Sequence, residues 1–256
     1  MANTAHETAT TAQGALQGKH ALVTGGARGL GAAITRRLAR AGALVHVADI
    51  RRETAEDLCA ELKEDGCRAL YTELDVRDPA AVAGAFRELD ETGPQPLDIL
   101  VNNAAVDVSK PIEHLSAEEV TRVVGTNLLG PMYTCLEVYR RMVDRGGGHI
   151  VNILSTASCR TWTEAGPYAA GKAGLRAFTH TLFKEAQRDC LGVGVTGVVA
   201  GGMETPFVLD RFPDADTSLL QSPEIVADTV LYALSVPSGS VVPELVVVPR
   251  SESSWP

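Results

Sequence analysis

The sequence of 256 residues lacks any long apolar stretch, and this limits the class of protein. No hydrophobic run reaches the roughly 18 residues that a helix needs to cross a bilayer. The first 17 residues contain no lysine or arginine and no apolar centre, so they do not have the pattern of a secretory signal. We therefore expect a cytoplasmic protein without membrane association, in which residues 1–17 form a disordered leader.

Positive charge and paired metal ligands are also scarce. The formal net charge is −9, whereas a nucleic-acid surface would be basic, so nucleic acid is not an expected partner. The five cysteines include no C-x-x-C pair, and the six histidines include no pair at i, i+4 spacing. Neither a disulfide framework nor a metal site is expected.

Strand and helix patterns alternate along the rest of the chain, without a linker or a repeat. Strands are expected at or within 20–25, 43–49, 68–76, 97–104, 149–155, 192–200 and 244–249, and helices at 29–42, 53–66, 79–92, 116–143, 168–190 and 223–235. Such alternation forms parallel βαβ units, and near-continuously apolar strands indicate a sheet covered on both faces. We predict one α/β domain over 18–256, with a doubly wound, seven-stranded and mostly parallel sheet between two helical layers.

A glycine-rich loop follows the first expected strand. In TGGARGLG (24–31), Gly25, Gly29 and Gly31 lie between a strand and a helix. Glycines here allow the backbone to approach a phosphate, and the helix N-terminus attracts it. A tight turn without a ligand would need the same residues, so this loop alone leaves both interpretations open.

Asp49, at the end of the second strand, favours a dinucleotide. A carboxylate at this position accepts hydrogen bonds from the ribose hydroxyls of an adenosine and repels a 2′-phosphate, which indicates NAD. The alternative is an ordinary N-cap for the helix near Glu53. Arg28 in the glycine loop can reach a 2′-phosphate, so NADP also stays open.

Three residues have the types needed for proton transfer to a hydroxyl or carbonyl group. Tyr168 and Lys172 are four residues apart and therefore share one face of a helix, and Ser155 ends the preceding strand. A nearby ammonium and an oxidised nicotinamide would lower the tyrosine pKa from its usual value near 10. Ser155 would hydrogen-bond the substrate oxygen. Purely structural roles for the three are the alternative.

The segment TNLLGP (126–131) interrupts the long helix expected over 116–143. Pro131 has no N–H to donate to the carbonyl of Asn127, so the helix should kink there. We expect an ordered water at that carbonyl, near Lys172, which would carry protons between Tyr168 and solvent.

In this order, the motifs resemble the short-chain dehydrogenase/reductase family from about residue 18 onward. TGGARGLG matches its cofactor loop, LDV (74–76) its adenine-contacting pair, NNAA (102–105) its N-N-A-G turn, and GGMET (201–205) its nicotinamide-contacting segment. The resemblance implies a Rossmann fold and a catalytic tetrad of Asn127, Ser155, Tyr168 and Lys172. The cofactor contacts it implies are Gly25, Arg28, Gly29, Leu30, Gly31, Asp49, Asp75, Val76, Asn103, Ala104, Tyr168, Lys172, Met203 and Thr205.

The sequence departs from the family pattern at three places. Ala105 replaces the last glycine of N-N-A-G, and Ala200–Gly201 replaces a P-G pair. The end, ELVVVPRSESSWP, replaces a glycine-rich turn. The first two changes remove no reactive group, and the third makes an unusual C-terminal arm an expectation.

The resemblance implies hydride transfer between NAD(H) and a secondary alcohol or ketone, with Tyr168 as general acid and base. A lid is expected over 203–222. Its apolar side chains and Trp162 favour a mainly apolar small-molecule substrate, with cyclic compounds among the candidates. The expected substrate contacts are Ser155, Trp162, Tyr168, Met203 and Phe207.

Two alternative functions remain open at this stage. One is reduction of a 3-oxoacyl group on an acidic acyl carrier protein, which would dock on basic residues such as Arg140, Arg141 and Arg145. The other is a non-catalytic dinucleotide sensor, which would not need the tetrad. The family usually pairs its two long helices, so a homodimer or homotetramer is expected through 116–143 and 168–190.

Overall fold

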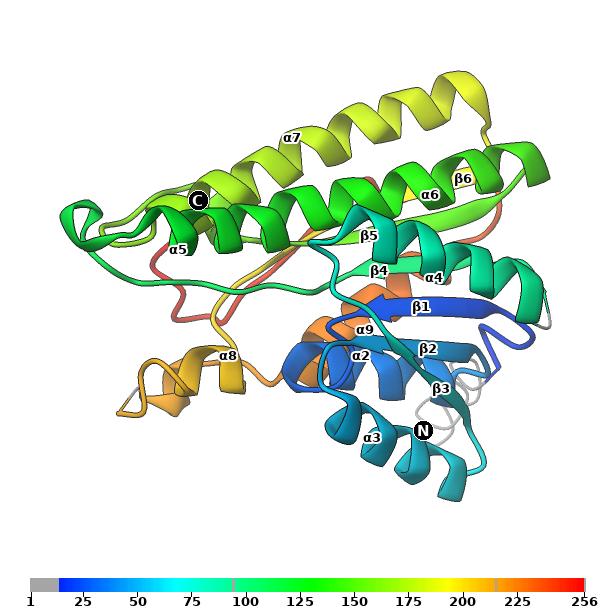
Figure 1. Ribbon diagram of the computed structural model, residues 1–256, viewed down its shortest axis with the longest axis horizontal. Coiled ribbons are helices and arrows are strands. Elements are labelled where there is room, and N and C mark those ends of the chain that lie inside the picture. The colour runs from blue at the N-terminus through cyan, green and yellow to red at the C-terminus, as the bar shows by residue number, and fades with distance from the viewer. Residues whose placement is uncertain (1–13, 94, 215, 256) are drawn as a thin grey trace, which may run out of the picture.

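A parallel sheet of seven strands forms the centre of the computed structural model, which describes residues 14–93, 95–214 and 216–255 (Figure 1). The strand order is β3-β2-β1-β4-β5-β6-β7, and every neighbouring pair is parallel. The strands are β1 (His20–Thr24), β2 (Leu44–Asp49), β3 (Arg68–Glu73), β4 (Ile99–Asn102), β5 (Gly148–Ser155), β6 (Val193–Ala200) and β7 (Glu244–Val247). The predicted doubly wound α/β fold is confirmed.

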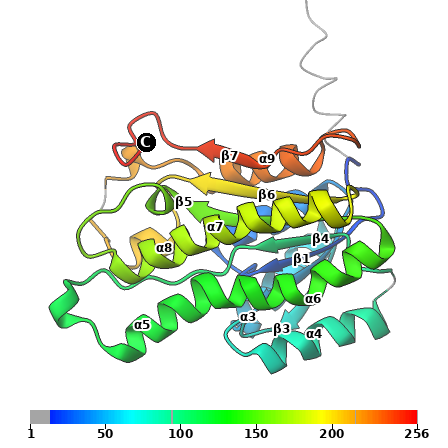
Figure 2. The ribbon, with the colours of Figure 1, turned by 90° about the horizontal axis from the view of Figure 1, so that it is seen from above.

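Helices cover both faces of the sheet (Figures 1 and 2). One layer contains α2 (Gly29–Arg40), α3 (Arg52–Glu64) and α9 (Pro223–Leu234); the other contains α4 (Pro79–Thr92), α5 (Ala117–Val124), α6 (Gly130–Arg145) and α7 (Gly166–Asp189). Each layer packs its apolar residues on the sheet in a separate buried cluster. Because helices cover both sides, β1, β2 and β4 are buried along their whole length, and most of their residues are apolar.

The expected leader lies mostly outside the described residues, which begin at 14. Its last residues pack against the domain instead of extending from it. Leu16 is only 3% exposed within the first core cluster, and its N–H donates to the carbonyl of Ala41 at 2.9 Å. The packed domain therefore includes residues 14–17.

The long helix expected over 116–143 is present but interrupted. Ser116 and Glu119 form the predicted capping box at its start. Between α5 and α6 the chain makes one wide π-helical turn, η2 (Gly125–Leu129), in which the N–H of Gly130 donates to the carbonyl of Gly125. The predicted interruption at TNLLGP is therefore real, and its form is a widened turn that precedes Pro131.

The segment expected as a lid contains two short elements, α8 (Pro206–Leu209) and η4 (Thr217–Leu219). A bridge between Met203 and Gln221 closes its base, and the Gln221 amide donates to the carbonyl of Val247 at 3.1 Å. The remaining short elements are η1 (Ile112–His114) and η3 (Thr156–Ser158). Elements of three or four residues are too short for hydrophobic periodicity to indicate.

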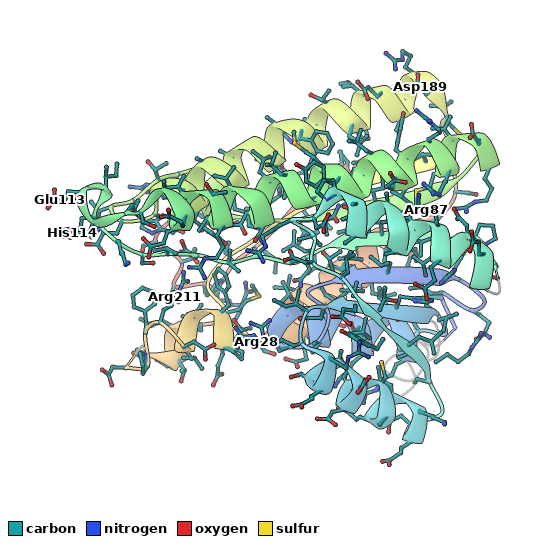
Figure 3. The ribbon with its side chains drawn as sticks, viewed as in Figure 1. Arg28, Arg87, Glu113, His114, Asp189 and Arg211 are labelled. Carbon is teal, nitrogen blue, oxygen red and sulfur yellow. The ribbon has the colours of Figure 1, made fainter. Side chains whose placement is uncertain are left out.

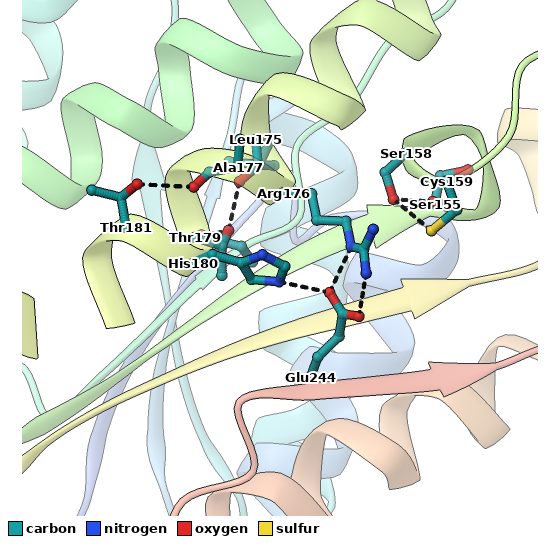
Figure 4. A network of polar contacts seen from close by, with 11 residues as sticks. Ser155, Ser158, Cys159, Leu175, Arg176, Ala177, Thr179, His180, Thr181 and Glu244 are labelled. Atoms are coloured by element: carbon teal, nitrogen blue, oxygen red, sulfur yellow. Dashed lines mark hydrogen bonds and ion pairs between the residues drawn. The ribbon is translucent and has the colours of Figure 1, made fainter. Parts of the chain in front are cut away.

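The last strand is tied to α7 by side chains. The Glu244 carboxylate accepts two hydrogen bonds of 2.7 Å from Arg176 and one of 3.0 Å from His180 (Figure 4). This contact fixes β7 beside β6, so that the C-terminal arm starts close to the carboxyl end of the sheet. In the part of the chain that is described, no helix is long and apolar enough to cross a membrane.

Candidate active site

A cavity of about 650 Å³ opens at the carboxyl ends of the strands, between the glycine loop, the start of α7 and the lid. It brings together most of the predicted site: Gly25, Arg28, Gly29, Leu30, Gly31, Asp49, Asn103, Ala104, Ser155, Trp162, Tyr168, Lys172, Met203, Thr205 and Phe207 all line it. In Figure 3, Arg211 lies above the segment that contains α8, and Arg28 lies between this segment and α2.

Three predicted site residues do not line this cavity. The Asp75 carboxylate binds the guanidinium of Arg77, and Val76 packs beside Gly130. Their predicted adenine contact has no support in this geometry and stays a prediction. Asn127 is fully buried behind the cavity wall.

The glycine loop has the geometry that requires glycine. Gly25 has φ of +61°, and a Cβ on Gly31 would lie 1.9 Å from the carbonyl oxygen of Gly25. The Thr24 hydroxyl accepts hydrogen bonds of 3.1 Å from the N–H groups of Asn103 and Ala104, which joins the loop to the NNAA turn. Side chains are thus excluded where α2 begins, so the loop fits a dinucleotide pyrophosphate.

Asp49 is buried at the end of β2 and is held in place by backbone groups. Its carboxylate accepts from the N–H of Ala27 at 3.1 Å and from the N–H of Arg51 at 3.0 Å. The N-cap of α3 is Arg51, so Asp49 is not the ordinary N-cap that was the alternative interpretation. Its fixed position at the cavity wall suits recognition of ribose hydroxyls.

Two arginines line the same cavity as Asp49, and each is paired with a carboxylate. Arg28 binds Asp210 of the lid at 2.8 Å, and Arg51 lies 3.6 Å from Asp49. Arg51 was not predicted as a site residue. Its position two residues after Asp49 would have indicated that it lies near the cofactor site. Each cation already has a carboxylate partner, which reduces its pull on a 2′-phosphate.

Ser155, Tyr168 and Lys172 are all buried and line the same cavity. They converge because β5 ends at Ser155 and α7 starts at Gly166, two residues before the tyrosine. The Lys172 ammonium donates to the carbonyl of Ile153 at 2.7 Å and lies 5.9 Å from the centre of the Tyr168 ring. This lysine is therefore fixed by backbone at the floor of the site.

Burial determines the pKa of Tyr168 in the chain without cofactor. Burial raises the pKa of Tyr168 to about 12, and the hydrogen bond with Ser155 lowers it only in part. Burial likewise lowers the pKa of Lys172 to about 8. In the chain without cofactor desolvation dominates and the ammonium is bound to a carbonyl, so the lowering expected with an oxidised nicotinamide in place stays a prediction.

Asn127 holds the segment that follows β4. Its amide donates to the carbonyl of Val106 at 2.8 Å and accepts from the N–H of Val106 at 2.9 Å. Val106 and Asp107 line the cavity, so the side chain of Asn127 positions one wall of the site. The water and proton path expected at its carbonyl stay predictions.

Several cavity residues gave no signal in the sequence. Arg122, Asp107 and Arg211 line the cavity, and the last two form an ion pair between segments far apart in the chain. The C-terminal arm contributes Glu252, which accepts from the N–H of Gly202 at 3.0 Å. Such pairings depend on the tertiary structure, and no spacing rule predicts them.

The cavity therefore combines a cradle for a dinucleotide with a buried Ser–Tyr–Lys group, as in a dinucleotide-dependent oxidoreductase. Residues 19–216 match the family model described as short chain dehydrogenase. The chain belongs to the short-chain dehydrogenase family, as the motifs indicated.

Similar proteins agree with this assignment. The chain is 35% identical over 206 residues to 3beta-hydroxysteroid dehydrogenase 1 of Eggerthella lenta, covering 78% of this chain and 77% of that one. A variant of actinorhodin polyketide ketoreductase solved with NADPH is 31% identical, with a TM-score of 0.83 over 92% of this chain and 97% of that one. A 3-oxoacyl-[acyl-carrier protein] reductase with bound NAD from Brucella melitensis is 28% identical, with a TM-score of 0.82 over 94% and 93%. The chain is thus a dehydrogenase or reductase of the NAD(P)-dependent short-chain family.

Proposed function

We propose that the protein interconverts a secondary alcohol and a ketone on a mainly apolar small molecule, cyclic compounds included, with NAD(H) as cofactor. The observation that carries this proposal is the burial of Ser155, Tyr168 and Lys172 in one cavity with the glycine loop and Asp49. When bound, the nicotinamide would supply or accept the hydride.

Tyr168 would move the proton. With its pKa near 12 in the chain alone, the phenol is protonated at neutral pH and ready to donate to a ketone oxygen. In the oxidation direction it would take the hydroxyl proton. Ser155, which shares a hydrogen bond with Tyr168, would hold the substrate oxygen, and Lys172 would bind ribose and stabilise the phenolate.

The choice of NAD over NADP rests on Asp49. A buried carboxylate fixed by two backbone N–H groups repels a 2′-phosphate. Arg28 and Arg51 would favour that phosphate, but each is paired with a carboxylate. The glycine loop, Asn103, Ala104, Met203 and Thr205 would hold the rest of the cofactor.

The substrate side of the cavity has several apolar walls. Phe207 lies 5.8 Å from Tyr168 between ring centres, and Val106, Trp162 and Phe212 also line the space. These surfaces suit an apolar skeleton next to the reacting carbon. The similarity to a hydroxysteroid dehydrogenase supports a cyclic one.

A ketoreductase acting on carrier-bound 3-oxoacyl groups is the second candidate, because two similar structures have related names. The basic surface on which an acyl carrier protein would dock has little support in this structure. Arg141 is paired with Asp90 and Glu137, and Arg145 donates to the carbonyl of Leu97. An acidic carrier would therefore find few free cations at this cluster.

The test is turnover of secondary alcohols and ketones, followed by the absorbance of reduced nicotinamide. Tyr168→Phe should lose at least about a hundredfold in kcat, since it removes the general acid and base. Cofactor affinity should change little. Wild-type turnover that survives in Tyr168→Phe would refute the assignment, and tight cofactor binding without any turnover would favour the sensor.

A further inference from the structure

One end of the cavity contains a pair of opposite charges that the proposed chemistry does not use. Arg211, just after α8 in the lid, contacts the carboxylate of Asp107 through Nη1. Both residues line the cavity beside Tyr168, and their charges act on its pKa in opposite directions. The pair therefore lies close to the reacting centre.

Aromatic rings fix the guanidinium of Arg211. Its central carbon lies 4.5 Å from the centre of the Phe207 ring and 5.6 Å from that of Phe212. Phe207 in turn packs on Tyr168. Stacking pre-orders the planar group, so little conformational entropy is lost when it binds a ligand.

The hydrogen-bonding capacity of Arg211 is not filled by the protein. Its Nε is buried and has no hydrogen-bond partner among the described residues. A guanidinium offers five donors in a planar fork, and a carboxylate is the group that accepts from such a fork in two parallel bonds. An acceptor from a ligand would satisfy the buried donor.

The cavity lining carries a small excess of positive charge among the described residues. Arg122 of α5 also lines the cavity and is exposed. Glu119, three residues earlier on the helix, is paired with Lys110 and also interacts electrostatically with Arg122. The described residues that line the cavity include five cationic side chains, Arg28, Arg51, Arg122, Lys172 and Arg211, and four acidic ones, Asp49, Asp107, Asp210 and Glu252. The formal balance of the cavity is therefore +1, which favours an anion.

We propose that Arg211 binds a carboxylate on the substrate, so that the enzyme acts on secondary alcohols or ketones with an acidic group beyond an apolar skeleton. In the free protein the Asp107 carboxylate forms an ion pair with the Arg211 guanidinium. The substrate carboxylate then replaces Asp107 in this contact or binds the guanidinium beside it. The inference rests on the proposed function and adds the substrate class to it.

The same ion pair would also suit a simple latch that closes the lid, and the two roles differ in a measurable way. A latch affects neutral and acidic substrates alike. A carboxylate site affects only the acidic one, and removing the competing carboxylate should then strengthen acid binding.

The experiment compares para-acetylbenzoate with its methyl ester, which has the same ketone and ring but no charge. We would measure the dissociation constant of each by isothermal titration in the presence of cofactor, and kcat/KM of each by reduced-nicotinamide absorbance. The wild-type protein should favour the acid by at least about tenfold in both. Arg211→Met should bring the acid-to-ester ratio near one, and Asp107→Asn should raise it above the wild-type ratio.

Arg87→Met is the matched control, because Arg87 is exposed on α4 and lies at the opposite end of the molecule in Figure 3. It should keep the wild-type ratio. Equal binding of acid and ester, no binding of either, or a preference that survives Arg211→Met would overturn the inference. Acid-selective binding without turnover would leave the inference standing and refute the proposed function.

Discussion

Among single residues, Asp49 has the largest expected effect on cofactor choice. Its buried carboxylate is oriented by Ala27 and Arg51, with Arg28 and Arg51 nearby as the only cations that line this part of the described cavity. The preference for NAD over NADP at this position depends on two opposing effects on the 2′-phosphate. The Asp49 carboxylate repels it, and the two paired arginines attract it.

Replacing Asp49 by Ser should invert that balance. The variant removes the charge that repels a 2′-phosphate and releases Arg51, so NADP affinity should rise and NAD affinity fall, each by about tenfold. Titration of both cofactors measures the change. Asp57→Ser, on the exposed surface of α3, is the control. An unchanged NAD-to-NADP ratio in Asp49→Ser would contradict this role.

Cavity residues could be identified from the sequence where a motif marks a local need, and could not where distant segments of the chain meet. Gly25 and Gly31 were identifiable because their turn excludes a Cβ, and Tyr168 and Lys172 because of helical spacing. Asp107 and Arg211 are brought together only when the lid folds over the sheet edge. No pattern within either segment indicates the other.

At the scale of elements, the π turn between α5 and α6 determines where Asn127 lies. The widened turn directs a fully buried amide onto both backbone groups of Val106. The sequence predicted the interruption, because Pro131 lacks an N–H. It did not predict the partner of the side chain, which depends on how β4 continues past the sheet.

Asn127→Ala should therefore loosen the cavity wall formed by Val106 and Asp107. Two part-buried backbone groups of Val106 would lose their partners, so the free energy of unfolding should fall by about 2 kcal/mol. Urea unfolding measures this, and kcat should fall with it. Thr181→Ala, at an exposed hydroxyl on α7, is the control. Unchanged stability in Asn127→Ala would show that the amide does not support the wall.

Element boundaries were predictable where apolar periodicity is long, as in α4 over Pro79–Thr92, which has the expected bounds. The lid was predicted as a single segment, and its short helix α8 was missed. Four residues complete barely one turn, so the helix depends on tertiary contacts and not on its own sequence pattern.

At the scale of the whole molecule, α6 carries a large apolar side chain that the described chain leaves exposed. Leu136 is 70% exposed, whereas Leu175 and Leu182 of α7 are buried in the protomer core and do not contribute to a surface. The two helices lie side by side in both ribbon views (Figures 1 and 2). We propose that a second copy covers this face in a dimer or tetramer.

Leu136→Glu should shift the protein toward the monomer, because it would place a charge in an apolar contact. Light scattering after size-exclusion chromatography measures the mass. Leu191→Glu, at an exposed leucine after α7, should not change it. A wild-type monomer would refute the proposed assembly.

The central claim is that a hydride passes between a carbinol carbon and the nicotinamide while Tyr168 moves the proton. Its most direct measurement uses a secondary alcohol with deuterium on the carbinol carbon, found active in the substrate panel, and mass spectrometry of the cofactor. Wild-type protein should yield reduced NAD carrying one deuterium, and Tyr168→Phe should yield almost none. Reduced NAD without the label, or equal labelling by Tyr168→Phe, would contradict the account.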